Sequence, residues 1–376
     1  MPEPRPRGGL EGVVVGESSI TDVRGGEGKL YYRGYPVPEL SESVGWEETA
    51  YLLLRGELPD PEEAHRLRAT LAERRRSLGD LAAIVGAIPA EATPMEALRS
   101  GFSLLGRGWD GFPPREEMFE TLLAFPPVFL PNLWRRRNHL PPLPEPEGLG
   151  QAAAYLWRLT GAVPDPRRLA ALEAYFVLVA DHGMNASTFV ARSVLSTWSD
   201  AASAVSAAVG SLKGPLHGGA PSLVADFLDR IGTPERAAPE VEATVARGER
   251  LMGFGHRVYR GEDPRARRLR ELARSVAKPE RMAVAEAVER AGLAALSRQH
   301  PERPWGLNVE FYAALVLEAA GIPRPLFPPT FALARTAGWV SHLTEQAQHN
   351  RLVRPEVQYT GPAPRPVPRP PVLGTG

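Results

Sequence analysis

Helix-start signals recur along this chain, and they constrain its fold more than any other feature. Asp60-Pro61 and Asp165-Pro166 each place proline directly after a residue type that caps helix N-termini. Thr93–Glu96 has the pattern of a capping box, with proline at the first helical position. After Asp165, apolar residues follow at helical spacing as far as Val179. The sequence therefore predicts helices beginning at positions 61, 94 and 166.

Apolar periodicity predicts more helices in the second half of the chain and few strands. The helices are expected at residues 187–196, 201–212, 223–231, 241–251, 264–276, 282–297, 310–320 and 330–346. The β-prone runs Val13–Val15 and Leu30–Tyr32 are separated by several glycines, which predicts a small hairpin-like element. The expected fold class is all-α with a minor N-terminal β element.

Length, charge and cysteine content limit the function classes. The chain has 376 residues, enough for two domains, and its 44 basic and 44 acidic side chains cancel. No global field therefore favours nucleic acid or an anionic membrane. The absence of cysteine excludes disulfides, thiolate metal sites and a cysteine nucleophile, and it fits a reducing compartment.

The composition of the terminal and linker segments also predicts their character. Met1–Gly9 lacks the apolar stretch of a secretory signal, and no uncharged apolar run approaches the roughly 18 residues of a membrane span. We therefore expect a cytoplasmic protein that does not bind membranes. Proline-rich composition predicts a linker at Leu140–Gly150 and an extended tail at residues 362–376.

Three of the eight histidines lie in settings that suit chemistry. His217 and His256 each lie in a glycine-rich turn, where glycine lets substrate approach the backbone closely. His182 follows Asp181 near a helix end. The alternative is that such histidines only cap helices. Packing or surface roles are expected for the remaining histidines: His65, His139, His300, His342 and His349.

The spacing of these histidines argues against several kinds of site. They are separated by tens of residues and form no His-x-x-x-His or His-Glu-x-x-His pattern, so no metal site is expected. Neither a Gly-x-Ser-x-Gly elbow nor a Walker-type loop is present. Neutral imidazoles in tight turns instead suit hydrogen bonding to carbonyl oxygens that gain negative charge during a reaction.

An ordered series of segments resembles the citrate synthase family, in particular its short dimeric members. The segments are Gly9–Val13, Asp181–Phe189, Leu212–Ala220, Met252–Tyr259, Asn308–Tyr312, Ala334–Trp339 and Asn350–Pro355. The resemblance implies a two-domain helical enzyme that condenses acetyl-CoA with oxaloacetate, with no permanently bound cofactor. The large domain would comprise residues 1–214 and 314–376, and the small domain residues 215–313.

The resemblance also implies residue roles. His217 would hydrogen-bond the thioester carbonyl, the carboxylate of Glu310 would remove the α-proton, and His256 would polarise the oxaloacetate carbonyl. Oxaloacetate would be held by His182, Arg265, Arg335 and Arg354, with Arg354 supplied by the partner subunit of a homodimer. The acyl-CoA would be held by Met252, Gly253, Phe254, Gly255 and Asn308.

Four positions depart from the family pattern. Glu310 stands where the family has aspartate, and Ala313, Val179 and Pro221 replace the usual serine, histidine and asparagine. Glutamate is one methylene longer, and a displacement of about 1 Å can cost a catalytic group ~10²-fold in rate. The departures leave two alternatives open: a 2-methylcitrate synthase or an enzyme for another 2-oxo acid, and a non-catalytic protein that binds acyl-CoA or dicarboxylates.

Overall fold

The computed structural model describes residues 8–10, 12–79, 81–214, 217 and 220–367, without the side chains of residues 220 and 221. Among these residues, no helix is both long enough and apolar enough to cross a membrane. Several residues of the predicted motifs lie outside the described part of the chain: Glu11, Pro215, Leu216, Gly218, Gly219 and the tail from Pro368 onward.

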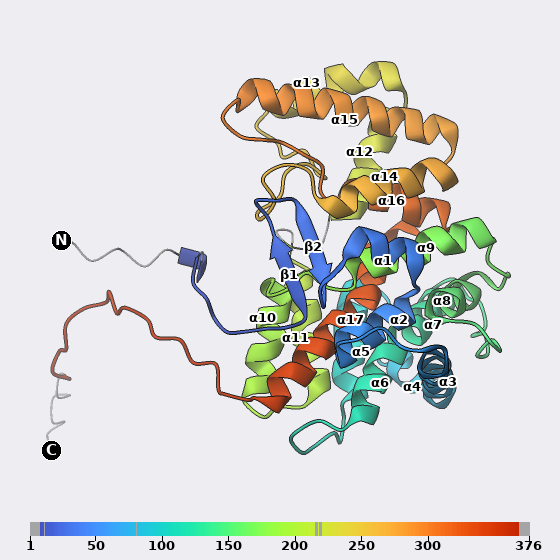
Figure 1. The fold of residues 1–376 in the computed structure, drawn as a ribbon, viewed down its shortest axis with the longest axis vertical. Helices are drawn as coiled ribbons and strands as arrows, with labels where there is room; N and C mark the ends of the chain where they lie inside the picture. Colours follow the sequence, from blue (N-terminus) through green and yellow to red (C-terminus); the bar gives the residue numbers. More distant parts are fainter. Residues whose placement is uncertain (1–7, 11, 80, 215–216, 218–219, 368–376) are drawn as a thin grey trace, which may run out of the picture.

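The described chain is built mainly from α-helices (Figure 1). The helices of the first half are α1 (Val37–Ser43), α2 (Trp46–Arg55), α3 (Pro61–Leu78), α4 (Ala82–Gly86), α5 (Pro94–Leu105), α6 (Glu116–Ala124), α7 (Pro126–Arg137), α8 (Gln151–Thr160) and α9 (Pro166–Val179). Those of the second half are α10 (Ala186–Ser196), α11 (Ala201–Leu212), α12 (Ala220–Ile231), α13 (Ala237–Ala246), α14 (Pro264–Val276), α15 (Pro279–Gln299), α16 (Val309–Ala319) and α17 (Phe327–Gln348). Short 3-10 turns lie at Gly8–Leu10, Pro234–Arg236 and Arg324–Leu326. The predicted all-α class is confirmed.

The small N-terminal sheet exists, but one of its predicted strands was wrong. Strands β1 (Thr21–Arg24), β2 (Lys29–Tyr32) and β3 (Tyr35–Pro36) form an antiparallel sheet in that order. Val13–Val15, the expected partner of β2, is not a strand, and Val14 is 87% exposed. The glycine-rich turn directly joins β1 to β2, so the segment just before the turn pairs with β2 and the more distant valines do not.

Local capping signals located the helix starts correctly. The side chain of Asp60 accepts a hydrogen bond from the Glu63 amide, and the Glu63 side chain accepts one from the Asp60 amide. Thr93 and Glu96 form the same reciprocal box at α5. The helix expected at 241–251 is instead α13, which ends at Ala246. Gly248 adopts a positive φ of 71° just beyond that end, a glycine stop signal that the prediction missed.

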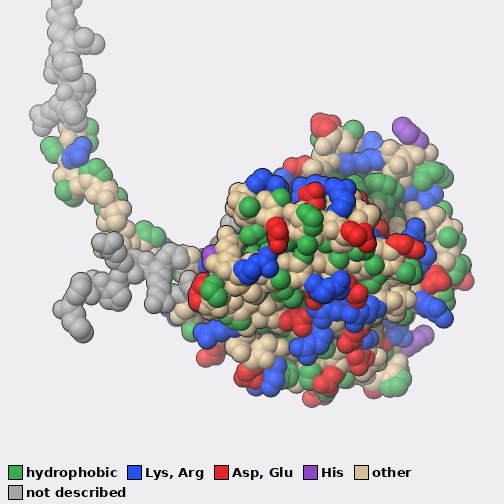
Figure 2. Space-filling view, turned by 90° about the horizontal axis from the view of Figure 1, so that it is seen from above, with side chains coloured by type: hydrophobic (Ala, Val, Ile, Leu, Met, Phe, Trp, Pro, Cys, Tyr) green, Lys and Arg blue, Asp and Glu red, His purple; other side chains and the backbone are tan. Residues whose placement is uncertain are grey.

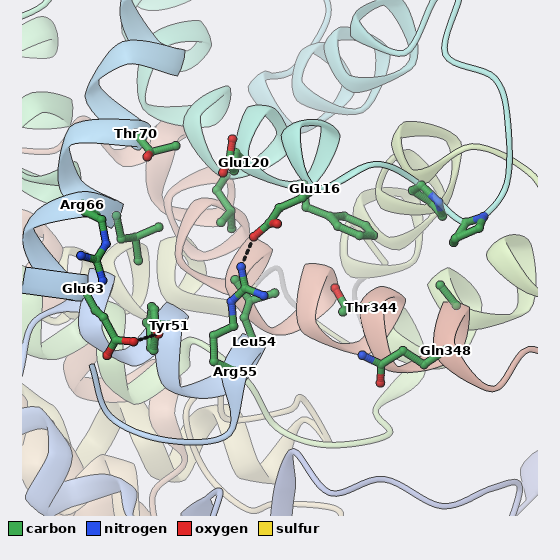
Figure 3. Close-up of a pocket in the computed structure, with 16 residues that line it drawn as sticks. Tyr51, Leu54, Arg55, Glu63, Arg66, Thr70, Glu116, Glu120, Thr344 and Gln348 are labelled. Carbon is green, nitrogen blue, oxygen red and sulfur yellow. Dashed lines mark hydrogen bonds and ion pairs between the residues drawn. The ribbon is translucent and has the colours of Figure 1, made fainter. Parts of the chain in front are cut away.

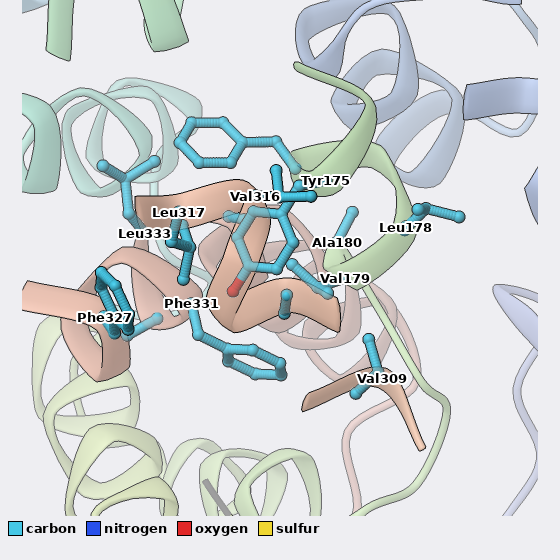
Figure 4. Close-up of a cluster of buried hydrophobic side chains, with 14 of the residues drawn as sticks. Tyr175, Leu178, Val179, Ala180, Val309, Val316, Leu317, Phe327, Phe331 and Leu333 are labelled. Carbon is cyan, nitrogen blue, oxygen red and sulfur yellow. The ribbon is translucent and has the colours of Figure 1, made fainter. Parts of the chain in front are cut away.

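Helix α17 lies in the centre of the large helical body, buried on all sides from Pro329 to Leu343. Figure 4 shows where the end of α9, the start of α16 and α17 meet through apolar side chains, among them Tyr175, Val309 and Phe331. Val179, one of the departures from the family pattern, is fully buried in this cluster. This packing fixes three elements that carry candidate site residues relative to one another.

The remaining helices form a second group. Helices α12 to α16 pack on one another above the central body, and α14 and α16 contact α9 below them (Figure 1). This group overlaps the predicted small domain at residues 215–313, although α16 extends beyond it to Ala319. The division into domains stays a prediction. The segment predicted as a linker, Leu140–Gly150, is irregular but anchored, because its Glu145 pairs with Arg75 and Arg158 and all three side chains are buried.

The described surface matches the balanced charge. Figure 2 shows basic and acidic side chains interspersed on one face of the molecule. Both terminal segments leave the same side of the helical body in an extended form (Figure 1).

Candidate active site

Most of the candidate residues lie at or near the ends of helices that meet between the two helical groups. His182 follows α9, and His217 lies between α11 and α12. His256 lies in the turn before α14. Two further candidates are on helices: Glu310 in the first turn of α16 and Arg335 in the buried middle of α17.

The ring of His256 is held by the turn that contains it. Its Nδ1 accepts hydrogen bonds from the amides of Val258 (2.9 Å) and Tyr259 (3.2 Å). Because a backbone amide can only donate, Nδ1 carries no proton and the neutral ring must carry its proton on Nε2. Burial lowers the pKa of His256 to about 4 against the opposing effect of Asp263. His256 is therefore neutral near pH 7 and presents an Nε2–H donor.

The ring of His217 has the opposite tautomer. Its Nε2 accepts a hydrogen bond from the amide of Ser187 (3.3 Å) and lies 2.9 Å from the Ser187 hydroxyl. That hydroxyl accepts a hydrogen bond from the indole Nε1 of the buried Trp339 (3.1 Å), and its own proton is shared between Nε2 of His217 and Oδ1 of Asn185 (2.8 Å). Burial, assisted by the charge of Arg335, lowers the pKa of His217 to about 4. His217 is therefore a neutral imidazole with its proton on Nδ1.

His182 lies against His256. The two ring centroids are 5.4 Å apart, and Nε2 of His182 lies 3.0 Å from the hydroxyl of Tyr259. Burial and the nearby charge of Arg265 lower the pKa of His182 well below its ordinary value, so this ring is also neutral. The site thus places uncharged imidazoles beside buried arginines.

Two of the predicted oxaloacetate-binding arginines are buried here. Asp263, the N-cap residue of α14, accepts two hydrogen bonds from the guanidinium of Arg265, at 2.9 Å from Nε and 2.7 Å from Nη2. Arg335 donates to the carbonyl of Val179 (2.7 Å) and lies over the ring of Phe331. Burial lowers the pKa of Arg335 to about 10, partly offset by Asp181. Arg335 is therefore a buried cation without a directly bonded carboxylate among the described residues.

Glu310 is a carboxylate free to act on a proton. Its amide is capped by Asn308 (3.1 Å), and its carboxylate has no hydrogen-bond partner within the described part of the chain. Burial raises its pKa to about 7, although the charges of Arg250 and Arg265 oppose the shift. A carboxylate with a pKa near the working pH suits a general base.

The Met252–Gly255 turn is bound to the start of α16. Phe254 pairs with Leu307 in an isolated bridge, and the Asn308 side chain donates to the carbonyl of Gly255 (3.0 Å). Gly253 has a φ of 86°, and a Cβ there would lie 2.7 Å from the Phe311 ring. The Phe254 side chain is itself buried against Phe311, so only the backbone of this residue is available to a ligand.

One predicted residue lies apart from this cluster. Arg354 is exposed on the extended C-terminal arm, outside the site of its own chain. Conversely, the sequence prediction missed Ser187, Tyr259, Trp339 and Asp263 as parts of the site. Three of them belong to the quoted family segments and Asp263 opens a predicted helix, but no local pattern says that Ser187 contacts a histidine 30 positions away.

A cavity of about 630 Å³ lies elsewhere, among α2, α3, α6 and the end of α17 (Figure 3). Its charged side chains already have partners: Arg55 pairs with Glu116, and Glu63 accepts a hydrogen bond from the Tyr51 hydroxyl. The described cluster of histidines and arginines contributes no residue to it. This cavity is therefore not the candidate active site.

Comparison with known proteins identifies the family. The sequence profile described as "Citrate synthase, C-terminal domain" matches residues 9–356. The chain belongs to the citrate synthase family. A citrate synthase from Deinococcus radiodurans is 37% identical over 364 residues, covering 94% of this chain and 95% of that protein. A 2-methylcitrate synthase from Mycobacterium tuberculosis is 36% identical, covering 94% and 90%.

The fold of the family is shared as well. The citrate synthase of Thermoplasma acidophilum, solved as a ternary complex with carboxymethyl coenzyme A and oxaloacetate, superposes with a TM-score of 0.86 at 28% identity. The aligned region covers 95% of this chain and 97% of that one. The predicted family, its helical fold and the prediction of a citrate synthase-type enzyme are thus confirmed, whereas the roles of single residues stay predictions.

Proposed function

We propose that this protein condenses acetyl-CoA with oxaloacetate and water to give citrate and CoA, with His217, Glu310 and His256 as its catalytic residues. The observation that carries the proposal is the pair of neutral histidines with opposite tautomers, each offering one N–H donor beside buried arginines. Two fixed donors can stabilise two carbonyl oxygens, and the condensation develops negative charge on one oxygen when the acetyl group loses its proton and on the other when the carbon–carbon bond forms.

The first step is removal of a proton from the acetyl group. The Glu310 carboxylate takes the proton from the methyl carbon, and the electron pair moves onto the thioester oxygen. The Nδ1–H of His217 donates to that oxygen and stabilises the enol. A neutral imidazole suits this role, because burial disfavours its charged form.

The second step joins the two substrates. The enol carbon attacks the keto carbon of oxaloacetate, whose oxygen is polarised by the Nε2–H of His256 and becomes a hydroxyl. The proton that this oxygen gains balances the one that Glu310 removed from the methyl group, so Glu310 ends as a carboxylate again and no net proton is taken up. Arg265 and Arg335 hold the two carboxylates, and His182 contacts the keto acid. Water then hydrolyses the thioester of the condensed intermediate, which releases citrate and CoA. The acyl-CoA lies along the backbone of Met252, Gly253, Phe254 and Gly255, near Asn308.

The proposal includes a homodimer. Arg354 lies on an exposed arm, outside its own site, and an arm of this kind can place a guanidinium in the site of a second copy. A guanidinium there would add a third charged hydrogen-bond donor for the keto acid. The absence of cysteine is compatible with the cytoplasm as the location of this enzyme.

The acyl-chain preference tests this proposal against its main alternative. Release of CoA thiol is measured with acetyl-CoA and with propionyl-CoA, each with oxaloacetate. We expect kcat/KM to favour acetyl-CoA by about ten-fold or more, since one methylene in a closed pocket changes kcat/KM by ~10- to 200-fold. A preference for propionyl-CoA would instead assign a 2-methylcitrate synthase, an activity favoured by the M. tuberculosis relative and by the departures at Val179, Pro221, Glu310 and Ala313.

A binding protein without turnover is the second alternative, motivated by Glu310. Calorimetry that detects oxaloacetate or acyl-CoA binding, with no CoA released over a broad temperature range, would support it and end the catalytic proposal.

The pH dependence follows from the pKa values of two groups. Glu310 must be ionised to accept a proton, so its pKa of about 7 predicts that kcat/KM falls as the pH drops through about 7. Arg335, with a pKa of about 10, should lose its charge and its grip on oxaloacetate as the pH rises through about 10. A profile of kcat/KM between about pH 5 and 11 checks this, and a flat acid limb would contradict the assignment of Glu310.

A further inference from the structure

A buried hydrogen-bonded chain of charged and titratable side chains lies behind the site and has no part in the proposed reaction. Arg192 on α10 contacts His342 on α17, which contacts Asp181 in the turn after α9. His342 and Asp181 are completely buried. Glu345 and Gln346, on the last turns of α17, fix Arg192 through its Nη1 (2.6 Å) and Nε (3.0 Å).

The direction of the hydrogen bonds in this chain is determined. Arg192 can only donate, so Nδ1 of His342, 3.2 Å from its Nη1, is the acceptor. The proton of a neutral His342 then lies on Nε2 and points at Oδ2 of Asp181, 3.3 Å away. The donors run from Arg192 through His342 to Asp181, and Asp181 receives them.

Asp181 in turn holds the backbone next to His182. Its Oδ2 also accepts hydrogen bonds from the Gly183 amide (2.8 Å) and from the Thr21 hydroxyl of β1 (2.6 Å). The residues on both sides of His182 are thus tied to one oxygen atom. The Asp181 backbone is also held from the sheet, because its amide donates to the Tyr32 hydroxyl (3.0 Å) and its carbonyl accepts from it (2.8 Å).

Helix α17 approaches this turn very closely. The Gly338 amide donates to the carbonyl of Ala180 (3.1 Å), and a Cβ at Gly338 would lie 2.4 Å from that carbonyl oxygen and from Oδ1 of Asp181. Arg335 lies one turn earlier on α17 and binds the carbonyl of Val179. The turn that carries His182 and the helix that carries Arg335 are therefore in fixed contact. His342 of that helix adds a hydrogen bond to Asp181 of the turn.

We propose that Arg192, His342 and Asp181 act as positioning residues for the keto acid, because they lock the His182 turn onto α17 at the distance at which His182 and Arg335 bind the same substrate. The inference rests on the proposed function. The burial of the chain explains why it is effective, since buried hydrogen bonds to a charged group are strong and their loss is not compensated by water. The position of these side chains also predicts that their loss affects binding of one substrate only. They contact the oxaloacetate side of the site, whereas the acyl-CoA turn lies on the other helical group.

The test compares variants on one helix. His342→Leu removes both hydrogen bonds, whereas His342→Gln keeps an N–H donor where Nε2 lies. Ser341→Ala is the matched control: it removes a buried hydrogen bond of α17, to the Ala337 carbonyl at 2.8 Å, without touching Asp181. The KM values of both substrates, kcat and the calorimetric affinity for oxaloacetate are measured for each protein.

We expect His342→Leu to raise KM and the dissociation constant for oxaloacetate about ten-fold, in line with the loss of a buried hydrogen bond to a charged group. KM for acetyl-CoA should stay within about two-fold, His342→Gln should recover most of the affinity, and Ser341→Ala should resemble wild type. Equal changes in both KM values, or no recovery with glutamine, would overturn the proposal and leave His342 a structural residue.

A second variant serves if His342→Leu does not fold. Thr21→Val removes the 2.6 Å hydrogen bond to the same Asp181 oxygen from the half-buried sheet. It should weaken oxaloacetate binding selectively, and an unchanged affinity would overturn the proposal. If the wild-type protein released no CoA, only the proposed function would be wrong. Oxaloacetate binding by the variants would still test the role of the buried hydrogen-bonded side chains.

Discussion

Glu310→Gln is expected to lower kcat by ~10³-fold while leaving oxaloacetate affinity nearly unchanged. Glutamine keeps the length and shape of the side chain but cannot take up a proton, and a positioned general base contributes ~10²- to 10⁴-fold in rate. The start of α16 should stay intact, because Asn308 caps it through the backbone amide of residue 310. The check is steady-state CoA release together with calorimetric titration of oxaloacetate.

The matched control is Glu318→Gln, which removes another carboxylate of α16. Glu318 pairs with Arg281 at 3.0 Å on a partly exposed face, and its loss should change kcat by less than about two-fold, as expected for a surface ion pair. If Glu310→Gln kept a tenth or more of the wild-type kcat, another group would have to be the base.

Replacing Glu310 by the shorter aspartate shows whether the site is adapted to glutamate or impaired by it. Glu310→Asp restores the residue that the family usually has but retracts the carboxylate by one methylene, and a displacement of about 1 Å can cost ~10²-fold. We expect a loss of about that size, because the Glu310 carboxylate lies within the influence of Arg250, Arg265 and Asp263 at its present length. A gain in kcat would mean that glutamate is a weakened base here.

Features encoded by neighbouring residues were predictable from the sequence, and long-range pairings were not. The capping boxes at Asp60 and Thr93 need only residues three positions apart, and both are present as predicted. Strand pairing depends on which segment is joined to its partner by the turn. Thr21–Arg24, directly before the turn, pairs with β2, whereas Val13–Val15 does not, although its valines have a high β-propensity. Tertiary context decided the pairing.

The same division applies to the candidate site. Glycine-rich turns identified His217 and His256 as candidates, but the contacts that determine which ring nitrogen carries the proton were only partly predictable from the sequence. His256 is fixed by amides two and three residues away, whereas His217 depends on Ser187, 30 positions distant. His342 was predicted as a packing or surface residue, and its contact with Asp181 spans 161 positions, beyond the reach of any local pattern.

The opposite tautomers of His217 and His256 lead to a crossed pair of substitutions. An asparagine amide occupies the place of a histidine Nδ1, and a glutamine amide that of Nε2. In the proposed reaction the donor of His217 is Nδ1–H and that of His256 is Nε2–H. We therefore expect His217→Asn to be at least about ten-fold more active than His217→Gln, and His256→Gln to exceed His256→Asn by a similar factor.

The size of the effect follows from the cost of losing such a donor. Removing one donor to an oxygen that gains charge costs ~10²- to 10³-fold in kcat, so the mismatched variants should fall by this amount and the matched ones should recover part of it. Each pair differs by one methylene and controls for the loss of the ring, so the comparison isolates where the N–H lies. The measurement is kcat with both substrates saturating, with thermal unfolding to show that all four variants fold. If His217→Gln were the more active of its pair, Nε2 would be the donor, and the hydrogen bond from the Ser187 amide could not be part of the reactive state.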